Sequence, residues 1–166
     1  MSVTARQTAF SILLKIEKDK AYSNIALDSA VKGCSLDSTD CAFISRLVYG
    51  VTERKITLDF VISQFLNQPI KKLKAEVLVI LRIGTYQILY MDKIPDSAAV
   101  NESVTLAKNN KSSYASGVVN AVLRKVSLER ENVFKSLSGD ERLSVLYSAP
   151  IDLVRFLKHH YNEENA

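Results

Sequence analysis

The segment KLKAEVLVILRIGTYQILYM, residues 72–91, is apolar on most of the sides that a helix would present. Such a helix is expected at the centre of a fold, with neighbouring helices around it. Gly84 is expected to let one of those neighbours approach closely. The longest apolar stretch, Val77 to Ile83, is interrupted by Arg82 and is far shorter than the roughly 18 apolar residues of a membrane span. We therefore expect no membrane partner.

Apolar residues recur at helical spacing on both sides of this segment, and no run alternates with a period of two for long enough to predict a strand. The 5 Gly and 3 Pro leave little material for the tight turns of a sheet. The predicted fold class is all-α, a bundle of about seven helices plus a short C-terminal helical extension. The first expected bundle helices run from the possible caps Ser2 and Thr4 to about Lys18, from Ser23 to Val31, and from Ser38 towards Pro69 with a break or close crossing at Gly50. The others cover residues 72–91, the segment from the N-cap Asp96 to about Asn109, and the segment from Tyr114 to Val126. In the extension, helices are expected from Glu141 to Tyr147 and from Ile151 to His159.

The bulk composition is that of an ordinary globular domain. Apolar residues make up 47% of the 166 residues and charged residues 24%. The N-terminus has no charged head followed by an apolar region, so we expect a cytoplasmic location. Cys34 and Cys41 cannot form a tetrahedral metal site by themselves, and a reducing compartment argues against a disulfide. Both are expected to be structural thiols.

The distribution of charge is more informative than the net charge of +4. Residues 1–16 contain two basic residues and no acid, and residues 103–128 contain no acid at all. Two segments that carry only positive charge would attract a polyanion such as a nucleic acid, although chance clustering is the alternative. The basic residues of these segments are Arg6, Lys15, Lys108, Lys111, Arg124 and Lys125.

The sequence contains none of the common catalytic motifs. It has no GxGxxG after a strand, no GxxxxGK, no HExxH and no nucleophile elbow. The only histidines, His159 and His160, are adjacent and point in different directions on a helix, so we expect them to be solvated. We assign no catalytic residue, no metal site and no cofactor site to this chain.

Three acidic residues have structural interpretations. Asp37 and Asp40 lie three residues apart at a helix start, where the helix dipole favours negative charge, so we expect a capping role. Glu102 lies in a helix with an apolar face, and a partly buried carboxylate there needs a partner such as Arg82 or a backbone donor.

A series of short motifs gives a more specific indication. In chain order they are DCAF at 40–43, LVYGV at 47–51 with Arg54, LRIGTYQILY at 81–90, IP at 94–95, AAVNESV at 98–104, AK at 107–108 and VVNAVLR at 118–124. Together they cover residues 5 to about 130 and closely resemble the NusB-like family, which implies an RNA-binding helical bundle.

This family has two branches, the free-standing antitermination factors and the N-terminal domain of rRNA 5-methylcytosine methyltransferases of the Fmu/Sun type. The sequence YSAP at 147–150, with Leu153, Val154 and Leu157 after it, resembles the methyltransferase branch. The resemblance implies a NusB-like domain over residues 1–130 and a helical extension over residues 131–166 that leads towards an absent methyltransferase domain. S-adenosylmethionine is expected for the full-length parent and not for this chain.

The function implied is that of an RNA-binding accessory domain, which helps an attached cytosine-C5 methyltransferase hold ribosomal RNA. The expected partners are RNA and the attached or docked methyltransferase domain. The antitermination factors have an arginine-rich N-terminus, in which this sequence has only Arg6. A weaker positioning role is therefore favoured over strong RNA contacts. The alternatives are a free-standing transcription antitermination factor that acts with a ribosomal protein, and a structural helical module that orients the catalytic domain.

Candidate RNA contacts lie in two segments that pack near each other in the family. Tyr114 is a candidate for stacking on an unpaired base. Lys71, Lys72 and Lys74 are expected to form a separate cluster between two helices. For each candidate the alternative is a solvated surface residue. The candidates are Arg6 and Gln7 on the first helix, and Lys108, Lys111, Ser113, Tyr114, Arg124 and Lys125 around the last helix of the family domain.

Overall fold

The computed structural model describes residues 4–20 and 24–161, without the side chains of 24–27. These ranges contain nine α-helices, two short 3-10 helices and no strand, which confirms the predicted all-α class of about seven helices plus an extension. No helix in this part of the chain is long and apolar enough to cross a bilayer. In chain order the elements are α1 (Ala5–Asp19), α2 (Asn24–Lys32), α3 (Ser38–Glu53), α4 (Lys55–Ser63), η1 (Ile70–Lys72), α5 (Ala75–Tyr90), α6 (Asp96–Asn109), η2 (Ser113–Ala115), α7 (Ser116–Glu129), α8 (Gly139–Tyr147) and α9 (Ile151–His160).

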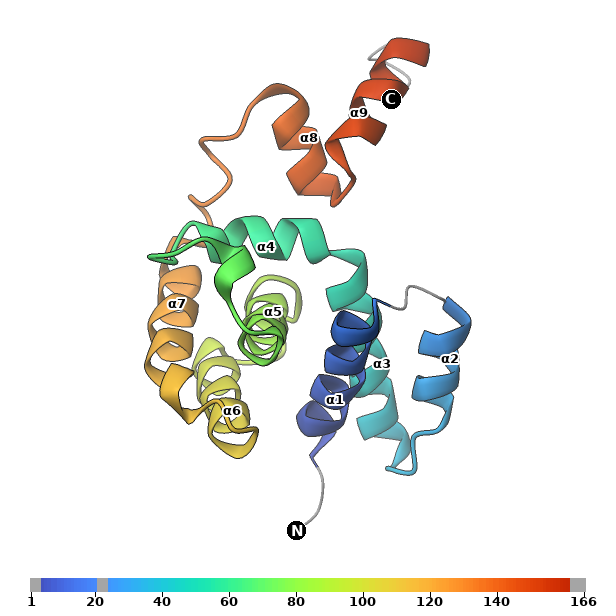
Figure 1. The fold of residues 1–166 in the computed structure, drawn as a ribbon, viewed down its shortest axis with the longest axis vertical. Coiled ribbons are helices and arrows are strands. Elements are labelled where there is room, and N and C mark those ends of the chain that lie inside the picture. Colours follow the sequence, from blue (N-terminus) through green and yellow to red (C-terminus); the bar gives the residue numbers. More distant parts are fainter. Residues whose placement is uncertain (1–3, 21–23, 162–166) are drawn as a thin grey trace.

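Helix α5 occupies the centre of the bundle, as the apolar segment 72–91 predicted. Eleven of its 16 residues are buried. It packs against α1, α3, α4, α6 and α7, and Figure 1 shows it almost end-on with these helices around it. Since every side of α5 meets another helix, its sequence has no polar stripe.

Two glycines allow the closest helix contacts. A Cβ on Gly50 of α3 would lie 2.1 Å from the Tyr86 ring, and a Cβ on Gly84 of α5 would lie 2.5 Å from a methyl of Leu123 and 2.7 Å from the Ser103 hydroxyl. Gly84 therefore brings α5 against both α6 and α7, as predicted. Gly50 marks a close crossing of α3 and α5, and the helix break expected there lies at Arg54 instead.

Helix starts were predicted with mixed success. Thr4 caps α1 by accepting a hydrogen bond from the Gln7 amide (3.1 Å), and Asp37 caps α3 by accepting from the Asp40 amide (2.8 Å). The expected starts at Ser2 and Ser23 lie outside the described residues.

Asp96 was wrongly expected as the N-cap of α6. Pro95 is the cap, and Asp96 lies in the first turn. Its carboxylate accepts a hydrogen bond from Ser127 and pairs with Arg130. The Asp96 carboxylate therefore forms contacts with residues outside α6 and does not cap its own helix.

Arg82 is a buried cation at the centre of an ion network. Its guanidinium donates to both oxygens of Asp59 (2.7 and 2.8 Å) and to Glu17 (2.9 Å). Burial would raise the pKa of Glu17, but Arg82, Lys55 and Lys20 outweigh it and keep that pKa below its ordinary value. Arg82, one of the two partners suggested for Glu102, is not its partner, because acids on α1 and α4 reach the guanidinium instead.

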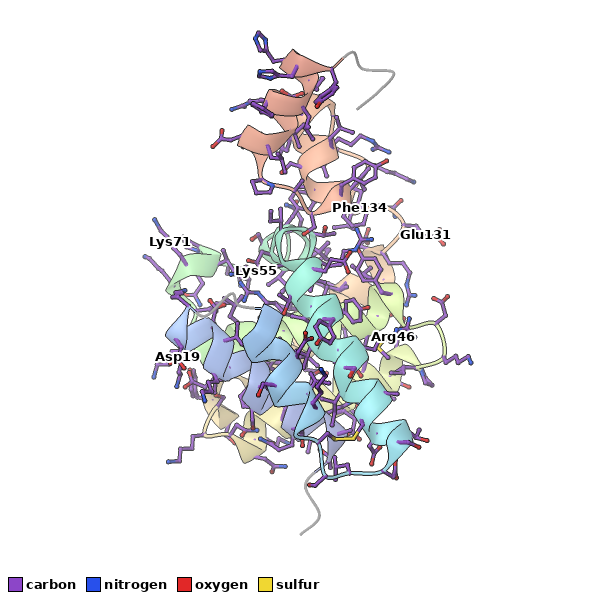
Figure 2. The ribbon with its side chains drawn as sticks, turned by 90° about the vertical axis from the view of Figure 1, so that its right-hand side faces the viewer. Asp19, Arg46, Lys55, Lys71, Glu131 and Phe134 are labelled. Carbon is purple, nitrogen blue, oxygen red and sulfur yellow. A yellow bond between two sulfur atoms is a disulfide. The ribbon has the colours of Figure 1, made fainter. Side chains whose placement is uncertain are left out.

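The two cysteines correct another expectation. Cys34 and Cys41 form a disulfide, with their Cα atoms 6.0 Å apart. Figure 2 shows this bond between the loop after α2 and the first turn of α3. The short connection turns the chain back on itself and brings the two sulfurs together. The expectation of free thiols rested only on an assumed reducing compartment, which says nothing about how close the fold brings the two cysteines.

The extension forms a hairpin that stands on one end of the bundle (Figures 1 and 2). Helix α8 packs against α4 and α9 packs against α8. The base of α8 is fixed by hydrogen bonds from Arg54 to the Leu146 carbonyl (3.1 Å), from the Ile56 amide to Ser148 (3.1 Å) and from Thr57 to the Val145 carbonyl. The hairpin is therefore anchored to the bundle at the α3–α4 junction.

Candidate functional site

A shallow groove runs between α6 and α7 on the side away from α5. Its first part has a volume of about 480 Å³. Lys108 is exposed at its edge, and amide and hydroxyl groups make up most of its lining. The lining residues are Asn101, Val104, Thr105 and Lys108 from α6, and Ser116, Gly117 and Asn120 from α7.

A second hollow of about 390 Å³ continues this groove towards the end of α7. Asn101 lines both parts, and Arg124 lines the second. The Arg124 guanidinium donates to the Asn120 side-chain oxygen (3.1 Å), which connects the two parts along one face of α7. The α6–α7 groove therefore has two exposed cations, Lys108 and Arg124, with side-chain amides between them.

The turn between α6 and α7 extends this surface. Lys111 has a left-handed backbone (φ 61°), which lets the chain reverse into η2. Tyr114 in η2 keeps 65% of its surface exposed. The Lys74 ammonium lies 5.4 Å from the centre of the Tyr114 ring. The lysine cluster at 71–74 is thus not separate from the candidate site, because Lys74 contacts one of its predicted members.

The two candidates on α1 have partners within the fold. The Gln7 and Asn110 side-chain amides exchange two hydrogen bonds (2.9 and 2.8 Å), which connect α1 to the end of α6. Arg6 is half-buried, donates to the Gln87 side chain (2.9 Å) and lies over the Phe43 ring at 5.1 Å.

Burial lowers the pKa of Arg6, and the nearby charge of Glu102 opposes that shift. An arginine remains a cation at neutral pH in spite of such a shift. The structure nevertheless uses this guanidinium inside the bundle, so only part of it is available to a ligand.

Lys125 faces away from the groove. It lines a different hollow of about 430 Å³ with Gln64, Phe65 and Glu129. Successive helix residues are rotated by about 100°, so Lys125 cannot share a face with Arg124. The eight predicted residues therefore divide into a groove and turn set (Lys108, Lys111, Ser113, Tyr114, Arg124), an α1 pair with internal partners (Arg6, Gln7) and Lys125 on another face.

The groove and turn set suits binding more than catalysis. Its cations and exposed aromatic ring lie beside the side-chain amides and hydroxyls that line the groove, and these are the groups that contact phosphates, base edges and unstacked bases. Across the described ranges no group of three or more His, Cys, Asp or Glu side chains is placed to hold a metal ion.

Sequence reasoning missed four residues of this surface. Asn101 and Asn120 belong to motifs that the sequence analysis quoted. Each lies on the same predicted helix as a candidate cation, Asn101 with Lys108 and Asn120 with Arg124, and this could have indicated their place in the groove. Asn110 and Lys74 gave no such signal. Their roles depend on contacts with Gln7 and Tyr114, which are far away in the sequence.

Known proteins similar to this chain fall into two groups. The first contains "Probable ribosomal RNA small subunit methyltransferase B" of Bacillus subtilis strain 168, which is 35% identical over 164 residues, 98% of this chain and 36% of that protein. The protein of the same name from Synechocystis is 39% identical over 150 residues, 89% of this chain and 33% of its own length. The chain thus spans about a third of the length of these relatives.

The second group matches a shorter part of the chain. "Transcription antitermination protein NusB" of Ruminiclostridium cellulolyticum is 38% identical over 124 residues, 74% of this chain and 86% of that protein. A solved structure of T. maritima NusB has the same fold, with a TM-score of 0.68 at 20% identity over 84% of this chain and 94% of that one. The sequence profile of the NusB family matches residues 3–128. The chain belongs to the NusB family.

Proposed function

We propose that this chain is an RNA-binding accessory domain that helps position ribosomal RNA for a cytosine-C5 methyltransferase. The observation that carries the proposal is the α6–α7 groove, which Lys108 and Arg124 line, together with the turn that joins the two helices, in which Tyr114 is exposed. Residues 103–128 contain no acid, and among the described residues the one carboxylate that lines the groove, that of Asp96, pairs with Arg130. Phosphate contacts from such a surface supply affinity without reading sequence.

The α8–α9 hairpin supports the link to a methyltransferase. The family profile ends at residue 128, before α8 begins. The match to the B. subtilis methyltransferase relative covers 98% of the chain and therefore includes the hairpin. We expect the methyltransferase domain to supply the cofactor and the nucleophile, since C5 attack requires an activated cysteine.

A second candidate function is that of a free-standing antitermination factor. Relatives of that name match a large part of the bundle, with 38% identity in one case. RNA binding by the same surface is common to both candidates. The structural-module alternative differs from both, because it requires little contact with RNA.

The direct test measures binding of the chain to fragments of small-subunit ribosomal RNA by fluorescence anisotropy. The double variant Lys108→Ala with Arg124→Ala should bind all fragments more weakly by a similar factor, because phosphate contacts do not depend on sequence. Lys32→Ala is the control for the loss of one charge, since Lys32 is an exposed lysine at the end of α2, on the far side of α1 and α3 (Figure 1). If the control lost half as much binding free energy as the double variant, bulk charge, and not the α6–α7 groove, would bind the RNA.

A chimera tests the link to methylation. The B. subtilis relative would carry this chain in place of its own matching segment, with and without the double variant. If the domain positions RNA, the two substitutions should raise KM for RNA and leave kcat unchanged, because they remove binding shared by ground and transition states. Unchanged KM would contradict the positioning role. Saturable binding of S-adenosylmethionine by the 166-residue chain in calorimetry would contradict the assignment of cofactor chemistry to the other domain.

A further inference from the structure

The outer edge of the molecule around α2 is much less tightly packed than its centre. Residues 28–43, from the last turns of α2 to the first turns of α3, contain no fully buried residue. In the central helix α5, eleven of 16 residues are buried. Helix α2 packs mainly against α3 and lies at the edge of the bundle in Figure 1. A segment with so little buried apolar surface opens locally at a lower cost in free energy than the core does.

The Cys34–Cys41 disulfide is a covalent link across this edge. Cys34 lies in the loop just after α2, and Cys41 lies in the first turn of α3 (Figure 2). The two residues are 7 positions apart in the sequence, so the bond closes a very short loop. Such a loop leaves the opened segment few conformations, which makes local opening rarer. The Tyr49 hydroxyl also donates to Asp28 of α2, but both side chains are exposed and water competes for this hydrogen bond.

Backbone hydrogen bonds hold the two cysteines near each other independently of the disulfide. The Cys34 amide donates to the Val31 carbonyl (3.1 Å) at the end of α2, and the Cys41 amide donates to the Asp37 carbonyl (2.9 Å) at the start of α3. The Cα atoms are 6.0 Å apart, a usual distance for a disulfide. None of these hydrogen bonds involves a sulfur atom. The reduced chain therefore keeps its two thiols in position to form the bond again.

The disulfide is also accessible to a reductant. Both cysteines are partly exposed, and Gly33, Ser35 and Ala42 beside them are exposed. The thiolate of a small thiol can attack one sulfur, which breaks the S–S bond and releases the other cysteine as a thiolate that takes up a proton. A second thiol then displaces the first, and the second cysteine also takes up a proton. Two small thiols are thus oxidised to one small disulfide while the protein disulfide is reduced to two thiols.

We propose that Cys34 and Cys41 form a reversible redox switch that sets how firmly α2 and the loop after it are held on α3. In the oxidised chain the bond restrains this edge of the bundle. In the reduced chain α2 opens more often, while α5 and its neighbours stay packed because the core does not depend on the two sulfurs. The inference is independent of the proposed function, since neither cysteine lines the α6–α7 groove.

The first measurement tests whether the bond responds to a thiol. The 166-residue chain is equilibrated in buffers with different ratios of reduced to oxidised glutathione, its free thiols are alkylated, and its mass is measured. We expect a change from no alkylated cysteine to two within the series, and the same change in reverse when the ratio is reversed. Two alkylated cysteines at every ratio would mean that the bond does not form. No alkylation at any ratio would mean a permanent brace, and either result overturns the switch.

The second measurement compares amide hydrogen exchange in the oxidised and reduced chains. Peptides from residues 28–40 should exchange on the order of ten- to fiftyfold faster in the reduced chain, because the opened segment regains the conformations that the closed loop excluded. Peptides from α5 should exchange at the same rate in both. Equal exchange over residues 28–40 overturns the proposal. A matching increase in α5 also overturns it, because reduction would then loosen the whole fold and not one edge.

The double variant Cys34→Ser with Cys41→Ser is the matched control for the glutathione buffers. It has no disulfide to reduce, so residues 28–40 should exchange as in the reduced parent at every glutathione ratio. A dependence on the ratio in this variant would assign the effect to glutathione itself and overturn the switch. The comparison of the two forms of the parent does not depend on this variant.

Discussion

The centre of the bundle and its outer surface over α6, η2 and α7 both carry positive charge, but they use it differently. Arg82 at the centre is 5% exposed and has two acidic partners, so its charge is neutralised inside the fold. Lys108 and Arg124 are exposed on an acid-free segment, where their charge remains available to a partner. Location and partners, rather than residue type, therefore separate cations that are neutralised inside the fold from cations that remain available to a partner.

The largest expected effect is at the centre. Arg82→Met should lower the free energy of unfolding by about 3 kcal/mol, because it leaves Asp59 and Glu17 without the guanidinium that pairs them. This is the low end of the range for broken buried pairs, since the Asp59 side chain keeps 28% of its surface exposed and can be hydrated. Urea unfolding measures the loss. A variant as stable as the parent would contradict the structural role of Arg82.

The same network predicts a dependence on pH. Glu17 has a pKa below its ordinary value of 4.5 in the folded chain. Its contribution to stability is therefore complete above that value and is lost as the pH falls through the lower pKa of the folded state. In Arg82→Met this acid-dependent loss should be smaller, which unfolding curves at several pH values below 5 would show. Parallel pH profiles for variant and parent would contradict the coupling.

Overpacking at the centre should have the next largest effect. Gly84→Leu should cost about 1–3 kcal/mol, because Leu123 and Ser103 are completely buried and already within 3 Å of the position of a Cβ. Gly117 in α7 is the matched control, since a Cβ there meets nothing within 4 Å. Thermal melting should show a lower transition for Gly84→Leu and little change for Gly117→Leu. Equal melting temperatures would place Gly84 outside the core.

Arg6 is half-buried, and its exposure is intermediate between that of the buried Arg82 and that of the exposed Lys108 and Arg124. Arg6→Ala should destabilise the chain by about 1–2 kcal/mol, because the side-chain oxygen of the fully buried Gln87 loses its donor. Loss of RNA affinity in this variant would therefore combine structural and contact effects. Gln7→Ala, which removes the exchange with Asn110 at a partly exposed site, should cost less. Chemical denaturation of both variants measures the difference.

The sequence predicted the part of the molecule that depends on local patterns. The apolar periodicity of residues 72–91 located the central helix, and Gly84 indicated the close contact with its neighbours. Side-chain partners were less predictable. Arg82 was suggested as one possible partner of Glu102 and in fact pairs with Asp59 and Glu17, and Asp96 was wrongly expected as a cap. Ion pairs between helices depend on distances that periodicity does not contain.

The candidate site shows the same division. The acid-free segment 103–128 pointed to Lys108 and Arg124, and the structure places both on one groove. Lys125 was grouped with them by sequence proximity, although one step along a helix turns it to another face. Lys74 was assigned to a separate cluster because its contact with Tyr114 spans 40 positions of the chain.

The most direct test of the outer surface as an RNA-binding surface is the salt dependence of RNA affinity. For the parent chain and a single-stranded RNA, log affinity should fall linearly with log salt, with a slope of about −0.7 for each contacted phosphate. Lys108→Ala with Arg124→Ala should flatten this slope by roughly 1.4 while the melting temperature stays within a degree or so of the parent. An unchanged slope in the double variant, or no RNA binding by the parent at low salt, would contradict the account.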